Sequence, residues 1–314
     1  MTTEQRLQTA LAAMCPGGVE EVGRIPAIAM PMHMGLDGTS VALNQGGQSL
    51  FAKAFHDGAL APFTFAGAAD AAQRAGAAGL GPRLIAADAT TRVLLFDHLG
   101  PDWRMALAPQ LQTGALREAT VLAKRHWHRS PALVATLSPF DLLQILADRL
   151  SPGLGQGTLI WKGAIPLPAF LDWMARIALA LAASGADLCP VHGENTASNV
   201  MIGPGDRVML VDFDRAVMAD PWWDLGALSL DLCRTEEERA ALVEIYAGRA
   251  DPALLARLKL YALVDDLVWA LWALLADEDP ATAGPELYKY ANNRLVRLVH
   301  HMDRFDLGAL LGKV

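Results

Sequence analysis

The sequence predicts an α+β fold with a small, β-rich N-terminal lobe and a larger, helical C-terminal lobe. Three observations support this prediction. Short apolar segments separated by glycine and aspartate dominate the chain up to Gly100, segments with helical periodicity follow, and hydrophobic residues make up 53% of the 314 residues. This composition provides enough apolar surface for a sizeable core and excludes a disordered chain.

The N-terminal region is expected to form a small sheet flanked by helices. Thr2 and Gln5 have the spacing of a capping box, so a short helix begins there and ends at Pro16-Gly17-Gly18. Asn44–Gly47 is a hairpin signal between two apolar segments. The predicted strands are Arg24–Met32, Ser40–Leu43, Ser49–Phe55, Leu84–Ala87 and Arg92–Phe96, with an alanine-rich helix over Phe63–Ala78.

Beyond Gly100 the apolar residues recur with the spacing of helices. The predicted helices are Leu111–His128, Phe140–Leu150, Pro168–Ala183, Glu236–Tyr246, Pro252–Ala276 and Pro285–Phe305. A hairpin around Gly203-Pro204-Gly205 interrupts them and joins Val200–Ile202 to Val208–Val211. We place the division between two domains, residues 1–98 and 99–314, at the short connection Asp97–Gly100. A cleft between two lobes is a common ligand site.

Charge and cysteine content exclude several classes of protein. Asp and Glu number 34 against 26 Lys and Arg, for a net charge of −8, so a nucleic-acid partner is not expected. The three cysteines form no CxxC pair, which fits a reducing compartment. No signal peptide is recognisable, and Asp265 and Asp266 interrupt the most apolar segment, Leu260–Ala276. We therefore expect a cytoplasmic protein without a membrane span; the oligomeric state is not indicated.

One segment, Val191–Leu225, carries most of the functional signal. It reads V-H-G-E-N-T-A-S-N over residues 191–199, L-V-D-F-D over 210–214 and D-P-W-W-D-L over 220–225. It resembles the catalytic core of the aminoglycoside phosphotransferase and choline kinase family, relatives of the protein kinases. That family has the motifs H-G-D-x-x-x-x-N, D-F-[DE] or D-W-[DE], and D-x-x-x-D-L. Lobe layout and motif order follow the family over nearly the whole chain.

The resemblance implies a protein-kinase-like fold and the transfer of phosphate from ATP, with Mg²⁺, to a hydroxyl of a small molecule. Any single residue of the motifs has an ordinary alternative, such as Asn199 capping a turn or Asp212 ending a strand. Their order and spacing together favour the kinase interpretation. The implied roles are a catalytic base (Glu194), a histidine bracing the loop (His192), magnesium ligands (Asn199, Asp212 and Asp214) and a carboxylate that braces the catalytic loop (Asp224).

In the N-terminal lobe, the resemblance implies that Lys53 contacts the α- and β-phosphates of ATP. Lys53 lies in the middle of an apolar strand, where an ammonium needs a partner, although a lysine that extends to solvent is the ordinary alternative. The turn over residues 35–40 would cover the phosphates through Gly35, Gly38, Thr39 and Ser40, and an ordinary hairpin is its alternative. Phe96 and Leu99 lie where the adenine would bind.

Two positions depart from the family pattern. Glu194 stands where the family has aspartate, and no glutamate occurs between Val22 and Arg117 to pair with Lys53, so Asp70 is the only acid on the predicted helix. These departures leave open a catalytically impaired, pseudokinase-like nucleotide-binding module. A helical binding protein without a nucleotide site is a third possibility, which requires the motif match to be accidental.

The sequence indicates the phosphate acceptor less clearly than the nucleotide and metal sites. Trp222 and Trp223 lie beside Asp224 in the last motif, and Asp265, Trp269 and Trp272 share one face of a predicted helix. An acid beside indole rings suits an amine or quaternary ammonium, so choline, ethanolamine, an aminoglycoside or another amino alcohol are the expected acceptors. Packing in the core is the favoured alternative for Trp269 and Trp272.

Overall fold

The computed structural model describes residues 1–28, 35–59, 61–157, 159, 161, 163–278 and 285–314. The chain forms two compact units. The first consists of Met1–Trp127, Leu133–Ala135 and His192–Val217, and the second of His128–Ala132, Thr136–Val191 and Met218–Val314. The predicted domain boundary after residue 98 therefore falls inside the first unit, which also contains the loop and strand of the first two motifs.

The first unit is built on a five-stranded antiparallel sheet in the order β1-β2-β3-β5-β4. Its strands are β1 (Glu20–Arg24), β2 (Gly38–Gln45), β3 (Gln48–Phe55), β4 (Leu84–Asp88) and β5 (Val93–Asp97). The predicted hairpin joins β2 to β3, and the Asn44 side chain accepts a hydrogen bond from the Gly47 backbone at 3.0 Å. The strand predicted over Arg24–Met32 is replaced by β1, which ends at Arg24; residues 29–32 lie outside the described residues.

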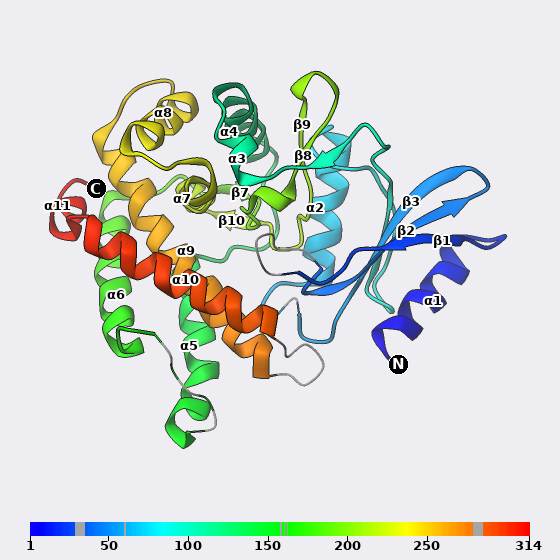
Figure 1. Cartoon of the computed structure of the whole chain (residues 1–314), viewed down its shortest axis with the longest axis horizontal. Helices are drawn as coiled ribbons and strands as arrows, with labels where there is room; N and C mark the ends of the chain where they lie inside the picture. Colours follow the sequence, from blue (N-terminus) through cyan, green and yellow to red (C-terminus); the bar gives the residue numbers. More distant parts are fainter. Residues whose placement is uncertain (29–34, 60, 158, 160, 162, 279–284) are drawn as a thin grey trace. The chain divides into compact units, whose positions relative to one another are not determined.

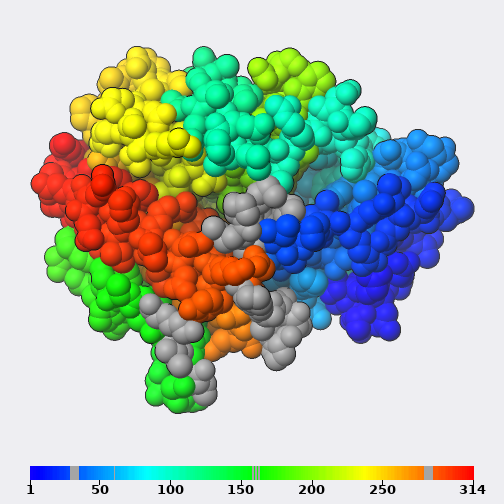
Figure 2. Space-filling model, viewed as in Figure 1, coloured from blue at the N-terminus to red at the C-terminus, as the bar shows by residue number. Residues whose placement is uncertain are grey.

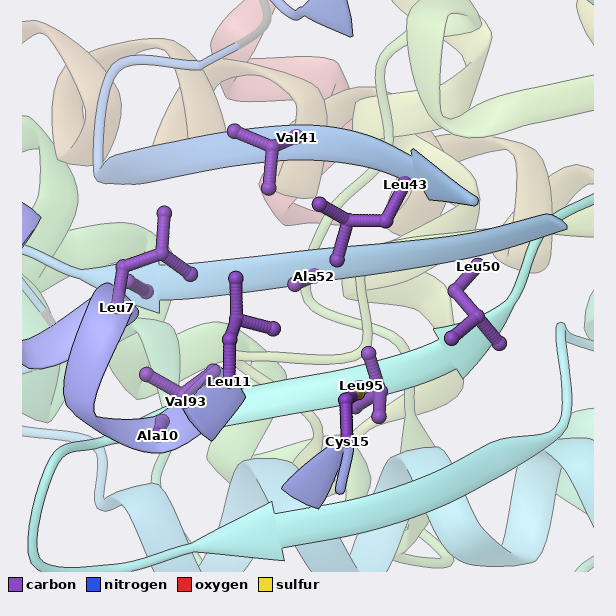
Figure 3. Close-up of a cluster of buried hydrophobic side chains, with 11 residues drawn as sticks. Leu7, Ala10, Leu11, Cys15, Val41, Leu43, Leu50, Ala52, Val93 and Leu95 are labelled. Atoms are coloured by element: carbon purple, nitrogen blue, oxygen red, sulfur yellow. The ribbon is translucent and has the colours of Figure 1, made fainter. Parts of the chain in front are cut away.

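Two helices cover the two faces of this sheet. Helix α1 (Thr3–Met14) begins with the predicted capping box, and its Leu7 and Leu11 point toward strands β2, β3 and β5 (Figures 1 and 3). Helix α2 (Phe65–Ala77) packs on the opposite face against Phe55 and Leu94. Because side chains alternate along a strand, Ala52 and Ala54 face α1 while Lys53 lies on the α2 face.

The remainder of the first unit consists of α3 (Ala108–Leu111), α4 (Gly114–His128, whose last residue belongs to the second unit) and a three-stranded sheet. That sheet has the order β6-β8-β9, with β6 (Arg104–Met105), β8 (Val200–Ile202) and β9 (Val208–Leu210). The predicted β8–β9 hairpin is confirmed. It is preceded by a turn of 3₁₀-helix, η1 (Ala197–Asn199), and contains another, η2 (Pro204–Asp206).

The second unit is helical and is organised around α9 (Pro252–Glu278), most of which is buried. Helix α10 (Pro285–Arg304) packs along α9 and forms part of the surface of this unit, in orange and red (Figure 2). The other elements are α5 (Pro139–Gln156), α6 (Leu167–Ser184), α7 (Pro221–Leu232), α8 (Glu236–Ala247), α11 (Leu307–Leu311) and the strand pair β7 (Cys189–Val191) with β10 (Val217–Ala219), the first residue of which belongs to the first unit. The long predicted helices are confirmed, whereas α7 was not predicted.

Helix α6 is the one helix among the described residues that is long and apolar enough to cross a membrane. The core helices of globular proteins meet the same length and composition test. In α6 a stripe of five side chains spaced three or four residues apart is buried: Leu167, Phe170, Met174, Ile177 and Leu181. This spacing is that of an amphipathic helix packed against a core.

Candidate functional site

Lys53 is the centre of a charged cluster inside the first unit. Its side chain is 10% exposed, and its Nζ lies 3.2 Å from Asp37 Oδ1 and 2.8 Å from Asp212 Oδ1, and also pairs with Asp214. Burial disfavours the charged ammonium, but the charges of Asp212, Asp214 and Asp37 outweigh it and raise the pKa of Lys53 well above its ordinary value. Lys53 therefore holds three carboxylates together.

Asp212 and Asp214 follow strand β9 and turn their carboxylates back toward β3. Asp212 has a φ of 71°, in the left-handed region that Asp tolerates better than most residues. Carboxylate oxygens of Asp37, Asp212 and Asp214 lie within 4.8 Å of one another. Burial, and then the like charge of Asp212, raise the pKa of Asp214 well above its ordinary value. A group of oxygen ligands at this spacing suits a hard divalent cation such as Mg²⁺.

Asn199 ends the short η1 turn and is buried. Its backbone carbonyl accepts a hydrogen bond from Val211 at 3.0 Å, which ties the loop to the strand that leads to Asp212. Its side-chain Nδ2 donates to Glu194 Oε2 at 3.4 Å. Because the amide nitrogen is directed at Glu194, the amide oxygen is the atom that can ligate a metal.

Glu194 is buried and forms an ion pair with Arg215, which is buried as well. The guanidinium stabilises the ionised carboxylate and fixes Oε1, while Asn199 contacts Oε2. Arg215 also lies near Asp37, with Nη2 3.7 Å from Oδ2. Each carboxylate oxygen has two lone pairs, so Glu194 keeps the capacity to accept a proton or a further hydrogen bond.

His192 is fully buried, and both of its ring nitrogens have partners. Lys124 Nζ lies 2.7 Å from Nδ1, and Nε2 lies 3.0 Å from the Val211 carbonyl. Because an ammonium can only donate, Nδ1 accepts and Nε2 carries the proton that is donated to Val211. Lys124 also donates to Asn195 Oδ1 at 2.5 Å. His192 is thus held between helix α4 and the carbonyl of the residue before Asp212.

Of these residues, Lys53, Asn199, Asp212 and Asp214 line a cavity of about 400 Å³, whereas Asp37, His192, Glu194 and Arg215 are not among its described lining residues. All of the described lining residues belong to the first unit. Of the predicted nucleotide and metal residues, eight line the cavity: Gly35, Ser40, Lys53, Phe96, Leu99, Asn199, Asp212 and Asp214. Phe51, Trp103, Met201 and Phe213 add an apolar wall. A volume of this size with an apolar wall and a few polar side chains is typical of small-molecule and cofactor sites.

Three residues predicted on the nucleotide side are not among the described lining residues of this cavity: Gly38, Thr39 and Asp70. Gly38 lies at the start of β2, where a Cβ atom would come within 2.5 Å of the Ala54 carbonyl. Asp70 forms an ion pair with Arg74 on its own helix at 2.9 Å, and its side chain is 40% exposed. The acid that contacts Lys53 from the N-terminal part of the chain is therefore Asp37, and not Asp70.

The last motif lies in the second unit, at the start of α7. Asp220 is the N-cap, and Asp224, in the first turn, is fully buried. Asp224 Oδ2 lies 3.0 Å from His128 Nε2, and the other ring nitrogen of His128 lies 2.8 Å from the Tyr246 hydroxyl. Trp222 and Trp223 are buried, and the Trp222 ring packs on Tyr246 with the centroids 5.3 Å apart.

The predicted acceptor face of α9 also lies in the second unit. Asp265 accepts hydrogen bonds from the indoles of Trp223 (3.1 Å) and Trp269 (2.9 Å) and pairs with Arg294 at 3.1 Å. Asp265 and Trp269 are buried, whereas Trp272 is half-buried with its ring 5.9 Å from that of Trp269. The contacts of Asp265 and Trp269 are those of a polar network within the helical core.

Sequence reasoning missed three residues of the site: Asp37, Lys124 and Arg215. Asp37 lies inside the predicted glycine turn, but it belongs to none of the motifs. Arg215 directly follows the D-F-D triplet, and a cation next to two aspartates at the start of an apolar segment is a sequence signal that points to it. Lys124 lies on α4 and is 1% exposed; nothing in the local sequence distinguishes it from a surface lysine.

Comparison with solved structures shows the same fold in small-molecule kinases. A choline/ethanolamine kinase family protein from Mesorhizobium loti is 23% identical, with a TM-score of 0.75 over 99% of this chain and 98% of that chain. The choline kinase LicA from Streptococcus pneumoniae is 15% identical, with a TM-score of 0.73 over 96% and 99%. An aminoglycoside phosphotransferase from Streptomyces rimosus is 20% identical, with a TM-score of 0.59 over 85% and 99%.

These similarities confirm the predicted protein-kinase-like α+β fold. No curated protein matches the sequence. The sequence profile of the phosphotransferase enzyme family matches residues 30–261, which is well over half of the chain and includes Lys53 and the first two motifs together with Asp224. The chain therefore belongs to the phosphotransferase enzyme family.

Proposed function

We propose that this protein transfers the γ-phosphoryl group of ATP to a hydroxyl group of a small molecule, with Mg²⁺ as cofactor. The observation that carries the proposal is the cavity in which Lys53, Asn199, Asp212 and Asp214 converge. A buried lysine beside acidic oxygen ligands is the arrangement that kinase-type phosphoryl transfer requires. The fold that the chain shares with a choline kinase solved in complex with AMP supports a nucleotide in this cavity.

In this proposal each residue acts on charge or position. Lys53 donates to the α- and β-phosphates, Gly35 and Ser40 line the same cavity, and its apolar wall together with Phe96 and Leu99 accepts the adenine. Asn199, Asp212 and Asp214 hold Mg²⁺, which neutralises the phosphates when bound. The ion pairs of the site join four carboxylates to two cations, so the group carries a net charge of −2 when all are ionised, which one Mg²⁺ balances: Asp37, Asp212, Asp214 and Glu194 with Lys53 and Arg215.

The acceptor hydroxyl would be oriented by Glu194, which accepts its proton as the bond to phosphorus forms. His192 keeps the loop in place, and Asp224 adds a buried carboxylate at the start of α7. Arg215 and Asn199 fix the two oxygens of Glu194 in the described structure, so the carboxylate is held in one orientation. Phosphoryl transfer depends mostly on positioning and charge, so an oriented carboxylate is sufficient.

For the acceptor we propose an alcohol that carries an amine. Support comes from the net charge of −8 and from the fold shared with choline kinases and an aminoglycoside phosphotransferase. The half-buried Trp272 is the residue of the predicted acceptor face that best suits contact with a cation. The three free cysteines and the proposed substrate class are consistent with a cytoplasmic enzyme.

A second candidate function is a nucleotide-binding module with impaired catalysis. The ion pair between Glu194 and Arg215 favours it, because a base neutralised by a buried guanidinium is a weaker proton acceptor. Under this alternative the protein binds MgATP and acts through a partner. The two functions differ in one measurable property, the release of ADP when an acceptor is supplied.

The test combines binding and turnover. MgATP should raise the melting temperature of the wild type by mass action, and Asp212→Ala should abolish the magnesium-dependent part of that rise. Asp172→Ala is the matched control, because Asp172 is an exposed acid on α6 that pairs with Arg176. ADP release is then measured with a panel of amino alcohols and aminoglycosides. Absence of any MgATP effect refutes the proposal, and binding without turnover on the whole panel favours the second candidate.

A further inference from the structure

Asp37 is the one carboxylate of the Lys53 cluster that lies outside the D-F-D triplet. Its side chain is 9% exposed, and its two oxygens face two cations. Oδ1 lies 3.2 Å from Lys53 Nζ, and Oδ2 lies 3.7 Å from Arg215 Nη2. Arg215 in turn pairs with Glu194. Asp37 therefore stands between the lysine at the nucleotide end and the carboxylate at the acceptor end.

The strand pairing fixes Asp37 in this place. Its backbone carbonyl accepts a hydrogen bond from the His56 amide at 3.0 Å, and the next residue, Gly38, lies opposite Phe55 in the β2–β3 register. A side chain at residue 38 would meet the Ala54 carbonyl at 2.5 Å, so glycine is needed for the close approach of these backbones. The same register places Ser40 opposite Lys53.

The chemistry of the cluster separates Asp37 from its neighbours. Asp212 and Asp214 are the carboxylates that the proposed function assigns to Mg²⁺. Once their oxygens bind a metal, they stabilise the Lys53 ammonium less. Asp37 is then the carboxylate that stays with Lys53. The acid of helix α2, Asp70, pairs with Arg74.

We propose that Asp37 is a positioning residue: it holds Lys53 toward the nucleotide phosphates and, through Arg215, steadies Glu194. The proposal rests on the proposed function, since it names the partner of the phosphate-binding lysine. It makes a directional statement about nucleotide affinity. A carboxylate that merely crowded the site would repel phosphates, so its removal would tighten MgADP binding; a carboxylate that orients Lys53 would weaken binding when it is removed.

The first measurement is MgADP binding by calorimetry, which needs no turnover. We expect Asp37→Asn to weaken MgADP binding by about tenfold or more, the size of one charge-assisted hydrogen bond. Asp37→Glu should recover part of the affinity. The control is Asp57→Asn, the same chemical change at an acid of the first unit whose partners are Arg6 and Arg92 and whose side chain is 74% exposed. The control should bind MgADP as the wild type does.

The second measurement asks whether Asp37 acts through Lys53. In a Lys53→Met background, Asp37→Asn should cause little further loss of MgADP affinity, because the partner is already absent. This double variant removes both charges of the pair, so it also serves where Asp37→Asn alone folds poorly. In an acceptor assay, Asp37→Asn should raise KM for MgATP and lower kcat, since Arg215 and Glu194 lose a neighbour.

The outcomes separate this inference from the function on which it rests. A wild type that binds no MgADP refutes the proposed function. A wild type that binds MgADP, with Asp37→Asn binding equally well or more tightly, overturns the role of Asp37. Weakened binding in Asp70→Asn together with normal binding in Asp37→Asn would assign the role to the α2 acid.

Discussion

Replacing Lys53 with methionine tests the charge balance of the site without any nucleotide. In the described structure Lys53 pairs with Asp37, Asp212 and Asp214, all in the first unit. Lys53→Met keeps most of the apolar stem and removes the ammonium. The three carboxylates then face one another with no cation at their centre, and both burial and like charge oppose their ionised forms.

The expected cost follows from the burial of these groups. Removing one partner of a buried ion pair destabilises a protein by about 3–5 kcal/mol. An unfolding entropy of about 2.1 cal mol⁻¹ K⁻¹ per residue gives about 0.7 kcal mol⁻¹ K⁻¹ for 314 residues, so the melting temperature should fall by about 5–8 °C. A first unit that unfolds separately has fewer residues and would shift further, so this range is the smaller expectation.

The assay is thermal unfolding with and without millimolar MgCl₂. If Asp212 and Asp214 hold Mg²⁺ as proposed, Lys53 competes with the cation for them in the wild type, whereas in Lys53→Met that competing ammonium is gone. Mg²⁺ alone should therefore raise the melting temperature of the variant more than that of the wild type. Lys289→Met is the control, because Lys289 forms an exposed pair with Glu286 on α10 and contributes little to stability.

Two results would refute this reasoning. The first is a Lys53→Met protein that melts with the wild type, which would mean that the three carboxylates do not depend on the ammonium. The second is an equal effect of MgCl₂ on both proteins, which would place the magnesium site elsewhere. A large destabilisation that MgCl₂ does not relieve would support the role of the ion pairs and contradict the proposed metal site.

Three further predictions concern the base, the tryptophans and pH. Glu194→Gln should lose most of kcat with MgATP binding near the wild type, and an unchanged turnover would exclude Glu194 as the base. Trp269→Leu should lower stability by about 2–4 kcal/mol with an unchanged acceptor KM, because Trp269 is buried and donates to Asp265; a raised KM with normal stability would instead place Trp269 in the acceptor site. Burial raises the pKa of Asp265 from 3.8 to about 6, so the folded state holds this proton more tightly than the unfolded chain does. The contribution of Asp265 to the free energy of unfolding, up to about 3 kcal/mol, is therefore present below pH 4 and lost as pH rises through about 6. Denaturant titrations of Asp265→Asn should lack this fall in the free energy of unfolding.

Local sequence signals predicted most of the elements. The capping box at Thr2 and the hairpin signal at Asn44–Gly47 are both confirmed, because each depends on interactions within a few residues. Helix α7 was missed although Asp220 and Pro221 form an N-terminal signal. Its residues from Trp222 to Ser229 are all buried, so α7 lacks the one-sided apolar stripe that identifies a helix from sequence.

The motifs identified candidate site residues that lie close together in the chain, on one short loop and the strand that follows it. Asn199 and Asp212 are joined by the β8–β9 hairpin, so their spacing in the chain already implies their proximity. Asp37 and Lys53 meet only through the register of β2 and β3, and Lys124 reaches His192 from a distant helix. Such contacts depend on tertiary packing, which no local pattern in the sequence reports.

The two departures from the family pattern meet at one arginine. From the sequence alone, the replacement of aspartate by Glu194 and the absence of a helix glutamate have no evident connection. In the structure Arg215 pairs with Glu194 and lies 3.7 Å from Asp37, the acid that contacts Lys53. We infer that the longer side chain of Glu194 and the carboxylate of Asp37 depend on the same guanidinium. Arg215→Met should therefore weaken MgADP binding and lower kcat together, whereas an effect on kcat alone would show that the two departures are independent.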